Sequence, residues 1–303
     1  MKYETRPIHL LQFGANGQLA RELSRALGND SDICTTVLSR AQADFTKPQE
    51  VAEAVLAAPH VNVVVNAVAY TAVDKAESEK ALAECVNAIT VGRLADACRR
   101  RNVPLIHVST DYVYDGTKST PYVESDATNP LSVYGKTKLA GEALIRDGLK
   151  EHVILRTSWV YSAHGSNFLK TMLRLGAERQ ELRIIDDQWG APTSATDLAR
   201  AIVKIVHNLA VSEDHRRFGT FHFANAGVTT WRGFAEEIFR QASSAGVSAR
   251  VVPIGSADYP LPARRPANSR LDTTKIGMVY GVAPALWQAS LASVMADLKE
   301  SRA

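Results

Sequence analysis

The sequence predicts an α/β fold, in which a Rossmann-type doubly wound parallel sheet carries a smaller α/β lobe beside it. Short β-branched runs alternate with longer amphipathic stretches through the first half of the chain. The strand-like runs are apolar almost throughout, which is typical of parallel strands buried on both faces. The length of 303 residues suggests about two domains, and 46% hydrophobic with 22% charged residues is ordinary for a globular protein.

The expected elements follow in order along the chain. Strands are expected at Ile8 to Phe13, Ile33 to Leu38, Val61 to Ala67, Val103 to Ser109, His152 to Arg156 and Thr220 to Ala224. Helices are expected at Gln18 to Leu27, Gln49 to Ala58, Ala88 to Arg101, Asn167 to Glu178, Ala195 to Leu209, Trp231 to Ser244 and Ala285 to Lys299. The segment Pro253 to Pro266 is rich in proline and alanine and predicts an extended, irregular loop.

Charge and cysteine content narrow the function classes. A formal net charge of +3 is too small to indicate a nucleic-acid partner, and no apolar run is long enough to indicate a membrane partner. Cys34, Cys85 and Cys98 form no CxxC pair, and no histidine stands at metal-ligand spacing. From these spacings we expect reduced thiols and no metal site. Because the N-terminus also lacks a signal-peptide pattern, we expect the protein to be cytoplasmic.

The turn after the first strand has the pattern of a phosphate-binding loop. Glycines there let the backbone approach a pyrophosphate, and the helix that follows offers free N–H groups and a positive dipole end. The residues expected to bind a cofactor in this turn are Gly14, Asn16, Gly17, Gln18 and Leu19. An ordinary strand–helix turn is the alternative, but the place of the turn at the start of a βαβ series favours a dinucleotide.

The end of the second strand indicates which dinucleotide is bound. NAD-binding folds usually carry an acid there, whereas this strand is followed by Ser39 and Arg40, which suit a 2′-phosphate. We therefore expect NADPH, with NADH possible; a solvated Arg40 is the alternative. Further cofactor contacts are expected near strand ends, where open α/β sheets bind ligands, at Asp44, Phe45, Ala67, Val68 and Ala69. A helix cap before Pro48 is the alternative role for Asp44.

Three residues form a candidate catalytic set for ketone reduction. Tyr134 and Lys138 are four positions apart and share one face of a helix. A lysine charge about 4 Å away, worth roughly 4 kcal/mol, would lower the pKa of Tyr134 by about three units and make it a useful proton donor. Thr110 ends the preceding strand and can stabilise the developing oxyanion, with Asp111 beside it as a substrate contact. An exposed helix with an ordinary Tyr and Lys is the alternative.

Seven segments then combine into an ordered set, at residues 13–18, 66–77, 109–114, 130–138, 156–161, 190–193 and 263–269. Together they resemble the extended short-chain dehydrogenase/reductase superfamily over nearly the whole chain. Within it they are most similar to the enzymes that reduce the C4 keto group of dTDP-4-dehydro-β-L-rhamnose to dTDP-β-L-rhamnose. The resemblance implies hydride transfer from NAD(P)H, with Tyr134 as proton donor, Lys138 as its helper and Thr110 as the third member.

The resemblance also implies a substrate cleft and a division into domains. Besides Thr110 and Asp111, it places substrate contacts at Val73, Asp74, Lys75, Trp159, Arg264 and Arg265. From the residues alone, core packing is the alternative for Trp159, and a solvated basic loop is the alternative to a lid at Arg264 and Arg265. We expect an NAD(P)-binding domain at 1–158, to which the chain returns at 193–225, and a substrate-binding lobe at 159–192 and 226–303.

Some members of the resembling family dimerise through a magnesium ion held by glutamates. Glu22 matches the first such position, but Thr196 and Asp197 stand at the second, so we regard magnesium as doubtful and expect Glu22 to be an exposed helix residue. A monomer or a homodimer is expected.

Two alternative functions stay open: another sugar-nucleotide reductase, epimerase or dehydratase of the superfamily, and a non-catalytic regulatory subunit that binds a nucleotide. Tyr112 stands where dehydratases carry a glutamate, which disfavours dehydration.

Overall fold

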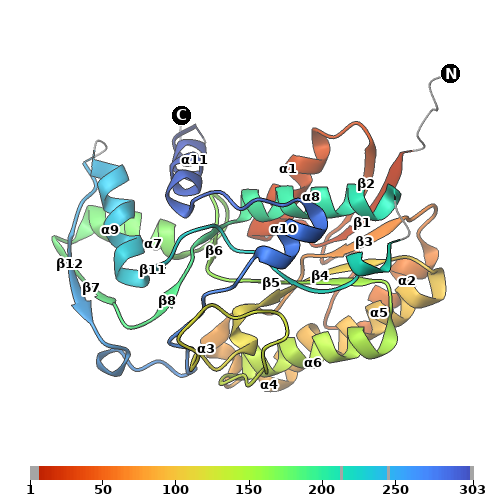
Figure 1. Ribbon diagram of the computed structural model, residues 1–303, viewed down its shortest axis with the longest axis horizontal. Helices are drawn as coiled ribbons and strands as arrows, with labels where there is room; N and C mark the ends of the chain where they lie inside the picture. The colour runs from red at the N-terminus through yellow and green to blue at the C-terminus, as the bar shows by residue number, and fades with distance from the viewer. Residues whose placement is uncertain (1–6, 212–213, 244–245, 301–303) are drawn as a thin grey trace.

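A six-stranded parallel sheet forms the centre of the larger part of the molecule in the computed structural model, which describes residues 7–211, 214–243 and 246–300 (Figure 1). Its strands are β1 (Ile8–Phe13), β2 (Ile33–Leu38), β3 (Val63–Asn66), β4 (Leu105–Thr110), β5 (His152–Thr157) and β10 (Gly219–His222). They lie in the order β10-β5-β4-β3-β1-β2. The chain reverses direction across the sheet between β1 and β3, and ligands of open α/β sheets bind at the carboxyl ends of strands beside such a point. The expected fold class is confirmed.

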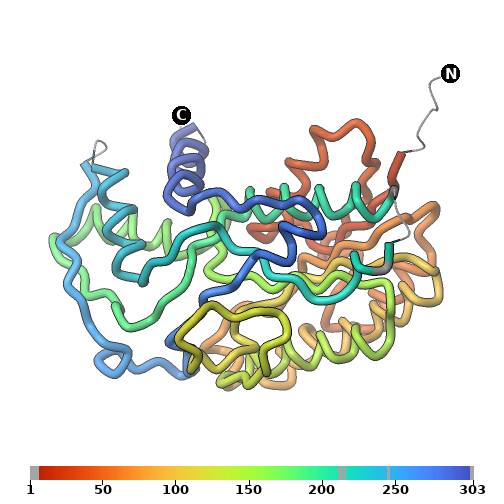
Figure 2. The backbone as a smooth tube through the Cα atoms, viewed as in Figure 1, coloured from red at the N-terminus to blue at the C-terminus, as the bar shows by residue number. Residues whose placement is uncertain are grey.

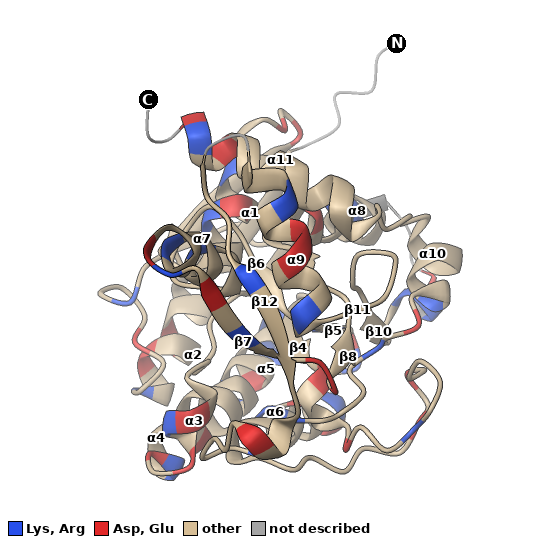
Figure 3. Cartoon of the chain, turned by 90° about the vertical axis from the view of Figure 1, so that its left-hand side faces the viewer, with Lys and Arg blue, Asp and Glu red and all other residues tan. Residues whose placement is uncertain are grey.

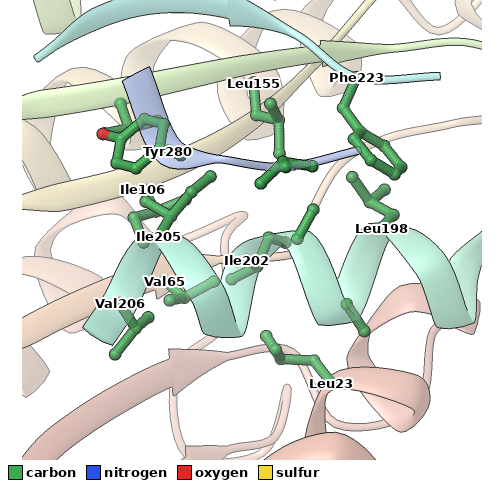
Figure 4. Packing of buried hydrophobic residues seen from close by; sticks show 14 of the residues in the cluster. Leu23, Val65, Ile106, Leu155, Leu198, Ile202, Ile205, Val206, Phe223 and Tyr280 are labelled. Carbon is green, nitrogen blue, oxygen red and sulfur yellow. The ribbon is translucent and has the colours of Figure 1, made fainter. Parts of the chain in front are cut away.

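Helices cover both faces of this sheet (Figure 1). One face carries α1 (Gln18–Gly28), α8 (Ala195–Val211) and α10 (Thr274–Tyr280), and the other carries α2 (Pro48–Ala57), α5 (Thr90–Arg101) and α6 (Val133–Gly148). Because side chains alternate along a strand, Val63 and Val65 enter the first core and Val64 enters the second. Figure 4 shows the first core, in which Leu23 of α1, Ile202 of α8 and Val65 of β3 belong to one apolar cluster.

The smaller lobe lies beyond the carboxyl ends of the central strands. It contains α7 (Phe168–Glu178), α9 (Trp231–Ala242) and α11 (Trp287–Glu300), and a parallel pair formed by β7 (Glu181–Ile185) and β12 (Arg250–Ile254). Two short pairs complete the sheets: β6 (Val160–Tyr161) with β9 (Thr193–Ser194), and β8 (Trp189–Gly190) with β11 (Thr229–Thr230). Figure 2 shows the chain passing between the two parts more than once, and Figure 3 shows the positions of acidic and basic residues interspersed along the backbone of this lobe.

The expected elements all occur, with bounds that differ by a few residues. The helix expected from Ala88 becomes α-helical only at Thr90, because a π-helical turn occupies Cys85–Ile89. The first residues of the expected loop at Pro253 belong instead to β12, where they pair with β7. The short helices α3 (Val73–Ala76) and α4 (Lys80–Glu84) were not predicted.

The expected domain division stays a prediction, and residues 1–6, 212–213, 244–245 and 301–303 of its ranges lie outside the described residues. The expected helix end at Ser244 lies there too, whereas α9 ends at Ala242. No helix in the described part of the chain has the length and hydropathy of a membrane span.

Candidate functional site

The glycine turn after β1 leaves room for a phosphate. Gly14 adopts a φ of +100°, in the left-handed region that favours glycine, and a Cβ added there would lie 3.2 Å from Val68 Cγ2. Gly17 is the N-cap residue of α1, and no side chain of the described residues caps the helix there. The first N–H groups of α1 are therefore available to an anion.

A cavity of about 360 Å³ extends from this turn to the ends of β2 and β3. The predicted cofactor residues that line it are Gly14, Asn16, Gly17, Arg40, Asp44, Phe45, Ala67, Val68 and Ala69. Ser39 is not among its lining residues, and its hydroxyl donates a hydrogen bond to Gln42. The cavity thus joins the phosphate turn to a wall that carries an arginine, as an adenosine 2′-phosphate requires.

Arg40 is 79% exposed in its side chain and pairs with Asp44, with 3.3 Å between Nε and Oδ2. Asp44 Oδ1 also accepts a hydrogen bond from the Thr46 amide, which holds the pKa of Asp44 below its usual value. The alternative of a helix cap is wrong, because the N-cap of α2 is Lys47. Among the described residues, Arg40 is therefore tethered only by this ion pair at the surface, which is weak enough to yield to a ligand phosphate.

The predicted catalytic residues meet at a second cavity of about 570 Å³. Tyr134 and Lys138 lie on α6, whose N-terminus is capped by Ser132, and Thr110 ends β4. Gln18 and Leu19 line this cavity as well. The two cavities share five lining residues, which are Asn16, Gly17, Ala67, Val68 and Ala69. An elongated ligand can therefore reach from Arg40 to Tyr134 along the ends of the strands.

The protonation of the catalytic pair differs from the prediction. Burial raises the pKa of Tyr134 to about 12, although a hydrogen bond with Thr110 opposes the shift. Lys138 does not lower it in this structure, because Nζ donates to the Val108 carbonyl at 2.7 Å and lies 3.0 Å from His107 Nε2. Burial also lowers the pKa of Lys138 to about 8. Tyr134 is thus a neutral phenol with a proton to give.

Asp111 adds a second unusual acid to the cavity wall. It is buried, and burial raises its pKa to about 6. Thr110 Oγ1 donates to its Oδ1 at 3.0 Å, while its Oδ2 has no partner at ordinary hydrogen-bond geometry among the described residues, although the nearby Ser269 hydroxyl partly opposes the rise in the pKa. A buried carboxyl oxygen without a partner is expensive to maintain and is ready to bind a polar ligand group.

Trp159 forms an aromatic wall that sequence reasoning identified only in part. Its ring stacks on Trp231, with 3.7 Å between centroids and 13° between planes, and both residues line the catalytic cavity. Trp159 has a φ of 47°, and a Cβ at Gly190 would lie 2.7 Å from its indole. Gly190 is therefore needed for this packing. Trp231 was missed, because a tryptophan at the start of an amphipathic helix carries no local signal that separates binding from core packing.

Of the substrate residues predicted on α3 and in the proline-rich loop, Asp74 and Arg265 contact each other. Arg265 donates to both carboxylate oxygens of Asp74, at 3.1 and 2.8 Å. Arg265 also lines a cavity of about 680 Å³ in the smaller lobe. Val73 lines the catalytic cavity, whereas Lys75 and Arg264 are exposed. The loop is thus fastened to α3 by one arginine of the predicted pair.

A buried ion pair fixes the catalytic helix, and sequence reasoning missed it. Arg156 on β5 contacts Glu142 on α6 at 2.6 Å, and the Ser109 hydroxyl donates to the same carboxylate at 2.5 Å. Glu142 lies one turn after Lys138 on α6. The pair therefore ties the helix that carries Tyr134 and Lys138 to the strands that carry Thr110 and Thr157.

The expectation that Glu22 is exposed is wrong. Glu22 is 2% exposed and contacts Arg25 at 2.7 Å and His164 at 3.4 Å. It is buried because α1 packs closely against α8, and Arg25 reaches on to Asp297 of α11. Among the described residues, no group of three or more His, Cys, Asp or Glu side chains is arranged to hold a metal ion.

Known proteins resemble this chain along nearly its whole length. A family described as the RmlD substrate binding domain matches residues 8–300. A dTDP-4-dehydrorhamnose reductase from Burkholderia thailandensis is 43% identical over 302 residues, which cover 96% of this chain and 99% of that protein.

Two solved structures agree in fold over the same extent. A dTDP-4-dehydrorhamnose reductase from Clostridium acetobutylicum has a TM-score of 0.89 and 36% identity, and the match covers 96% of this chain and 100% of the other. The reductase of the same name from Bacillus anthracis, solved in complex with NADP, has a TM-score of 0.87 and 32% identity, with 96% and 99% covered.

Proposed function

Because this chain belongs to the dTDP-4-dehydrorhamnose reductase family, whose RmlD substrate binding domain spans residues 8–300, we propose that it reduces dTDP-4-dehydro-β-L-rhamnose at C4 to give dTDP-β-L-rhamnose. The family resemblance expected from the sequence is confirmed. The observation that carries the proposal is the convergence of Tyr134, Thr110 and Lys138 on one cavity that also reaches the phosphate turn. The names of the relatives favour reduction over the epimerase, dehydratase and regulatory-subunit alternatives.

NADPH supplies the hydride when it is bound. The residues present fit this cofactor, because the uncapped start of α1 and the left-handed Gly14 leave a backbone cradle for its pyrophosphate. Arg40 would bind the 2′-phosphate at the adenosine end of the smaller cavity. The Bacillus anthracis relative is solved with NADP, which supports the same choice of dinucleotide.

Tyr134 delivers the proton in the proposed reaction. Its raised pKa keeps the phenol protonated at neutral pH, and Thr110 orients the hydroxyl by a hydrogen bond. As C4 of the sugar receives hydride, its oxygen takes the Tyr134 proton, and the phenolate that forms is stabilised by Lys138 one turn along α6. Asp111 lies beside this point, where its Oδ2, near the Ser269 hydroxyl, can accept from a sugar hydroxyl.

The rest of the substrate is held across the two parts of the molecule. The stacked pair Trp159 and Trp231 offers a flat apolar wall to the sugar ring. Arg265, in the proline-rich loop, lines the 680 Å³ cavity, where Arg179 and Arg183 add positive charge for a diphosphate beside the acidic Glu181 and Asp258. Val73, Asp74 and Lys75 of α3, with Arg264, would close the cleft around it. We also propose a cytoplasmic enzyme, acting as a monomer or a homodimer, without a nucleic-acid partner.

The test follows the loss of NADPH absorbance with dTDP-4-dehydro-L-rhamnose as substrate. Wild-type protein should oxidise NADPH only when substrate is present, and Tyr134→Phe should lose at least about a hundredfold in kcat. Tyr280→Phe is the matched control. The Tyr280 hydroxyl, on α10, donates to the Arg217 carbonyl, and Tyr280 does not line the catalytic cavity. Equal activity in wild type and Tyr134→Phe would exclude Tyr134 as the donor, and no oxidation in wild type would exclude the reaction.

A further inference from the structure

A buried histidine lies between the catalytic lysine and an asparagine, and the proposed reaction gives it no role. His107 on β4 is 0% exposed. Its Nε2 lies 3.0 Å from Lys138 Nζ, and its Nδ1 lies 3.0 Å from Asn66 Nδ2. Asn66 ends the neighbouring strand β3 and is also 0% exposed. The three side chains form a continuous hydrogen-bonded chain from the wall of the catalytic cavity into the sheet.

The orientation of the Asn66 amide determines which nitrogen of His107 carries the hydrogen. Asn66 Oδ1 accepts from the Val68 backbone N–H at 2.9 Å, so Nδ2 must be the atom that faces His107. An amide NH₂ can only donate, so His107 Nδ1 accepts and bears no hydrogen. Because a neutral imidazole carries one N–H, the hydrogen of His107 must lie on Nε2.

This tautomer in turn selects the form of Lys138. The Nε2–H of His107 points at Nζ, and an ammonium group has three donors and no acceptor, so two hydrogens would meet. An uncharged amine offers a lone pair to His107 and still donates to the Val108 carbonyl at 2.7 Å. A charged Lys138 would require the hydrogen of His107 to move to Nδ1 and the Asn66 amide to reverse. The reversal would remove the acceptor of the Val68 N–H.

We propose that Asn66 and His107 are positioning residues that hold Lys138 uncharged in the cofactor-free site, and that Lys138 takes up a proton when the dinucleotide binds. The proton comes from solvent and adds to the lone pair of Nζ. In the same change the hydrogen of His107 moves from Nε2 to Nδ1 and the Asn66 amide reverses, so that Nε2 can accept from the ammonium group. The ribose hydroxyls of the dinucleotide supply the acceptors that an ammonium group needs and that His107 in its cofactor-free tautomer does not offer. The proposal rests on the proposed function for the identity of the cofactor.

The other titratable groups around Lys138 set the pH range of this coupling. Burial lowers the pKa of Lys138 to about 8 against the opposing charge of Glu142 on α6, which is itself paired with Arg156 of β5. Tyr134 on the same helix stays neutral, and burial raises the pKa of Asp111, which follows β4. Since Lys138 is uncharged only above its own pKa, proton uptake should be large above about pH 8 and should fade as the pH falls below it.

The tautomer of His107 can be measured directly by nitrogen NMR on protein labelled at its histidine nitrogens. His107→Gln assigns the resonances by removing one ring. In the cofactor-free protein above about pH 8 we expect a protonated Nε2 and an unprotonated Nδ1, and addition of NADP should move the hydrogen to Nδ1. A hydrogen on Nδ1 before cofactor is added would overturn the proposal. This readout needs no turnover, so it stands whether or not the protein reduces the sugar nucleotide.

Proton uptake on NADP binding is measured by calorimetry in buffers of different ionisation enthalpy. At about pH 9 the wild type should take up nearly one proton per site. In Asn66→Asp the new carboxylate accepts from both Val68 N–H and His107 Nδ1–H, so Lys138 stays charged and the uptake should fall several-fold. Asn62→Asp is the matched control. Asn62 Oδ1 accepts from the exposed backbone N–H of His9, and the substitution introduces the same change of charge at the residue before β3.

The outcomes separate the coupling from the reaction. Uptake equal to wild type in Asn66→Asp would overturn the proposal, and uptake lost in Asn62→Asp as well would assign the effect to charge alone and overturn it too. If Asn66→Asp does not fold, the NMR measurement on wild type decides. A protein that shows the Nε2–H tautomer and proton uptake but reduces no sugar nucleotide would contradict the proposed function and leave this inference intact.

Discussion

The charged side chains at the two ends of the cleft differ in their exposure to solvent. At the adenosine end, Arg40 is 79% exposed in its side chain and makes one surface ion pair with Asp44. At the catalytic end, Lys138 is 1% exposed and shares its surroundings with the buried His107 and Asp111. Exposed groups keep their charge and are screened by salt, whereas buried groups change protonation. One end is therefore suited to recognising a fixed charge and the other to moving a proton.

The largest effect is expected at the catalytic end. Lys138→Met keeps the length of the side chain but removes the charge that stabilises the Tyr134 phenolate, so kcat should fall by about a hundredfold or more. Lys136→Met is the matched control on the same helix, because Lys136 is exposed, and it should retain activity within about twofold. Steady-state kinetics with saturating NADPH measures kcat for both variants. Similar losses of kcat in the two would contradict a specific role for the Lys138 charge.

Stability should depend most on the buried ion pair that holds α6. Glu142→Gln breaks the contact with Arg156 and leaves a buried guanidinium without its counter-ion, which should destabilise the protein by about 3 kcal/mol. Glu178→Gln is the control, since it breaks a surface pair with Arg174 and should change the free energy of unfolding by less than about 0.5 kcal/mol. Urea denaturation at neutral pH compares the two.

The same ion pair should make stability sensitive to acid. Burial is the largest single influence and opposes ionisation of Glu142, but the hydrogen bonds and charge of Arg156, together with hydrogen bonds from Ser109 and Arg146, outweigh it and leave the pKa lowered. A carboxyl whose pKa is lower in the folded state contributes stability above its unfolded pKa and loses it as the pH falls through the folded value. We therefore expect the wild type to lose stability below about pH 4 more steeply than Glu142→Gln. Parallel denaturation curves for the two would contradict this.

A change beside the stacked rings of Trp159 and Trp231 should have a more moderate effect on substrate binding. Gly190→Ala places a Cβ within 2.7 Å of the Trp159 indole, so the stacked pair must shift, and the KM for the sugar nucleotide should rise about tenfold with a smaller change in kcat. Gly28→Ala is the control, because a Cβ at Gly28 meets nothing within 4 Å. An unchanged KM in Gly190→Ala would show that the wall does not contact the sugar.

The smallest effect is expected at the exposed end. Arg40→Ala should raise the KM for NADPH by about fivefold to tenfold and leave the KM for NADH nearly unchanged, because only NADPH carries the 2′-phosphate. The loss should shrink as ionic strength rises, since the contact is screened by solvent. Arg99→Ala removes another exposed arginine, on α5, and should leave both values unchanged. Equal effects on NADPH and NADH would exclude a phosphate contact at Arg40.

Local patterns account for the parts of this molecule that were predictable. The run of valines at Val63–Asn66 identifies a central strand, because such a run is apolar on both faces. The glycine turn before α1 and the spacing of Tyr134 and Lys138 depend on backbone geometry over a few residues, so the sequence alone indicates a dinucleotide cradle and a catalytic helix face. Family membership followed from the same motifs taken in order.

Contacts between distant segments decided what the sequence left open. The ring stacked on Trp159 comes from Trp231, and Glu22 is buried by α8, so neither environment can be read from nearby residues. The protonation of Lys138 depends on how far it is desolvated and on which tautomer of His107 faces it. Desolvation and tautomer selection are properties of the assembled surroundings, which residue spacing along the chain does not determine.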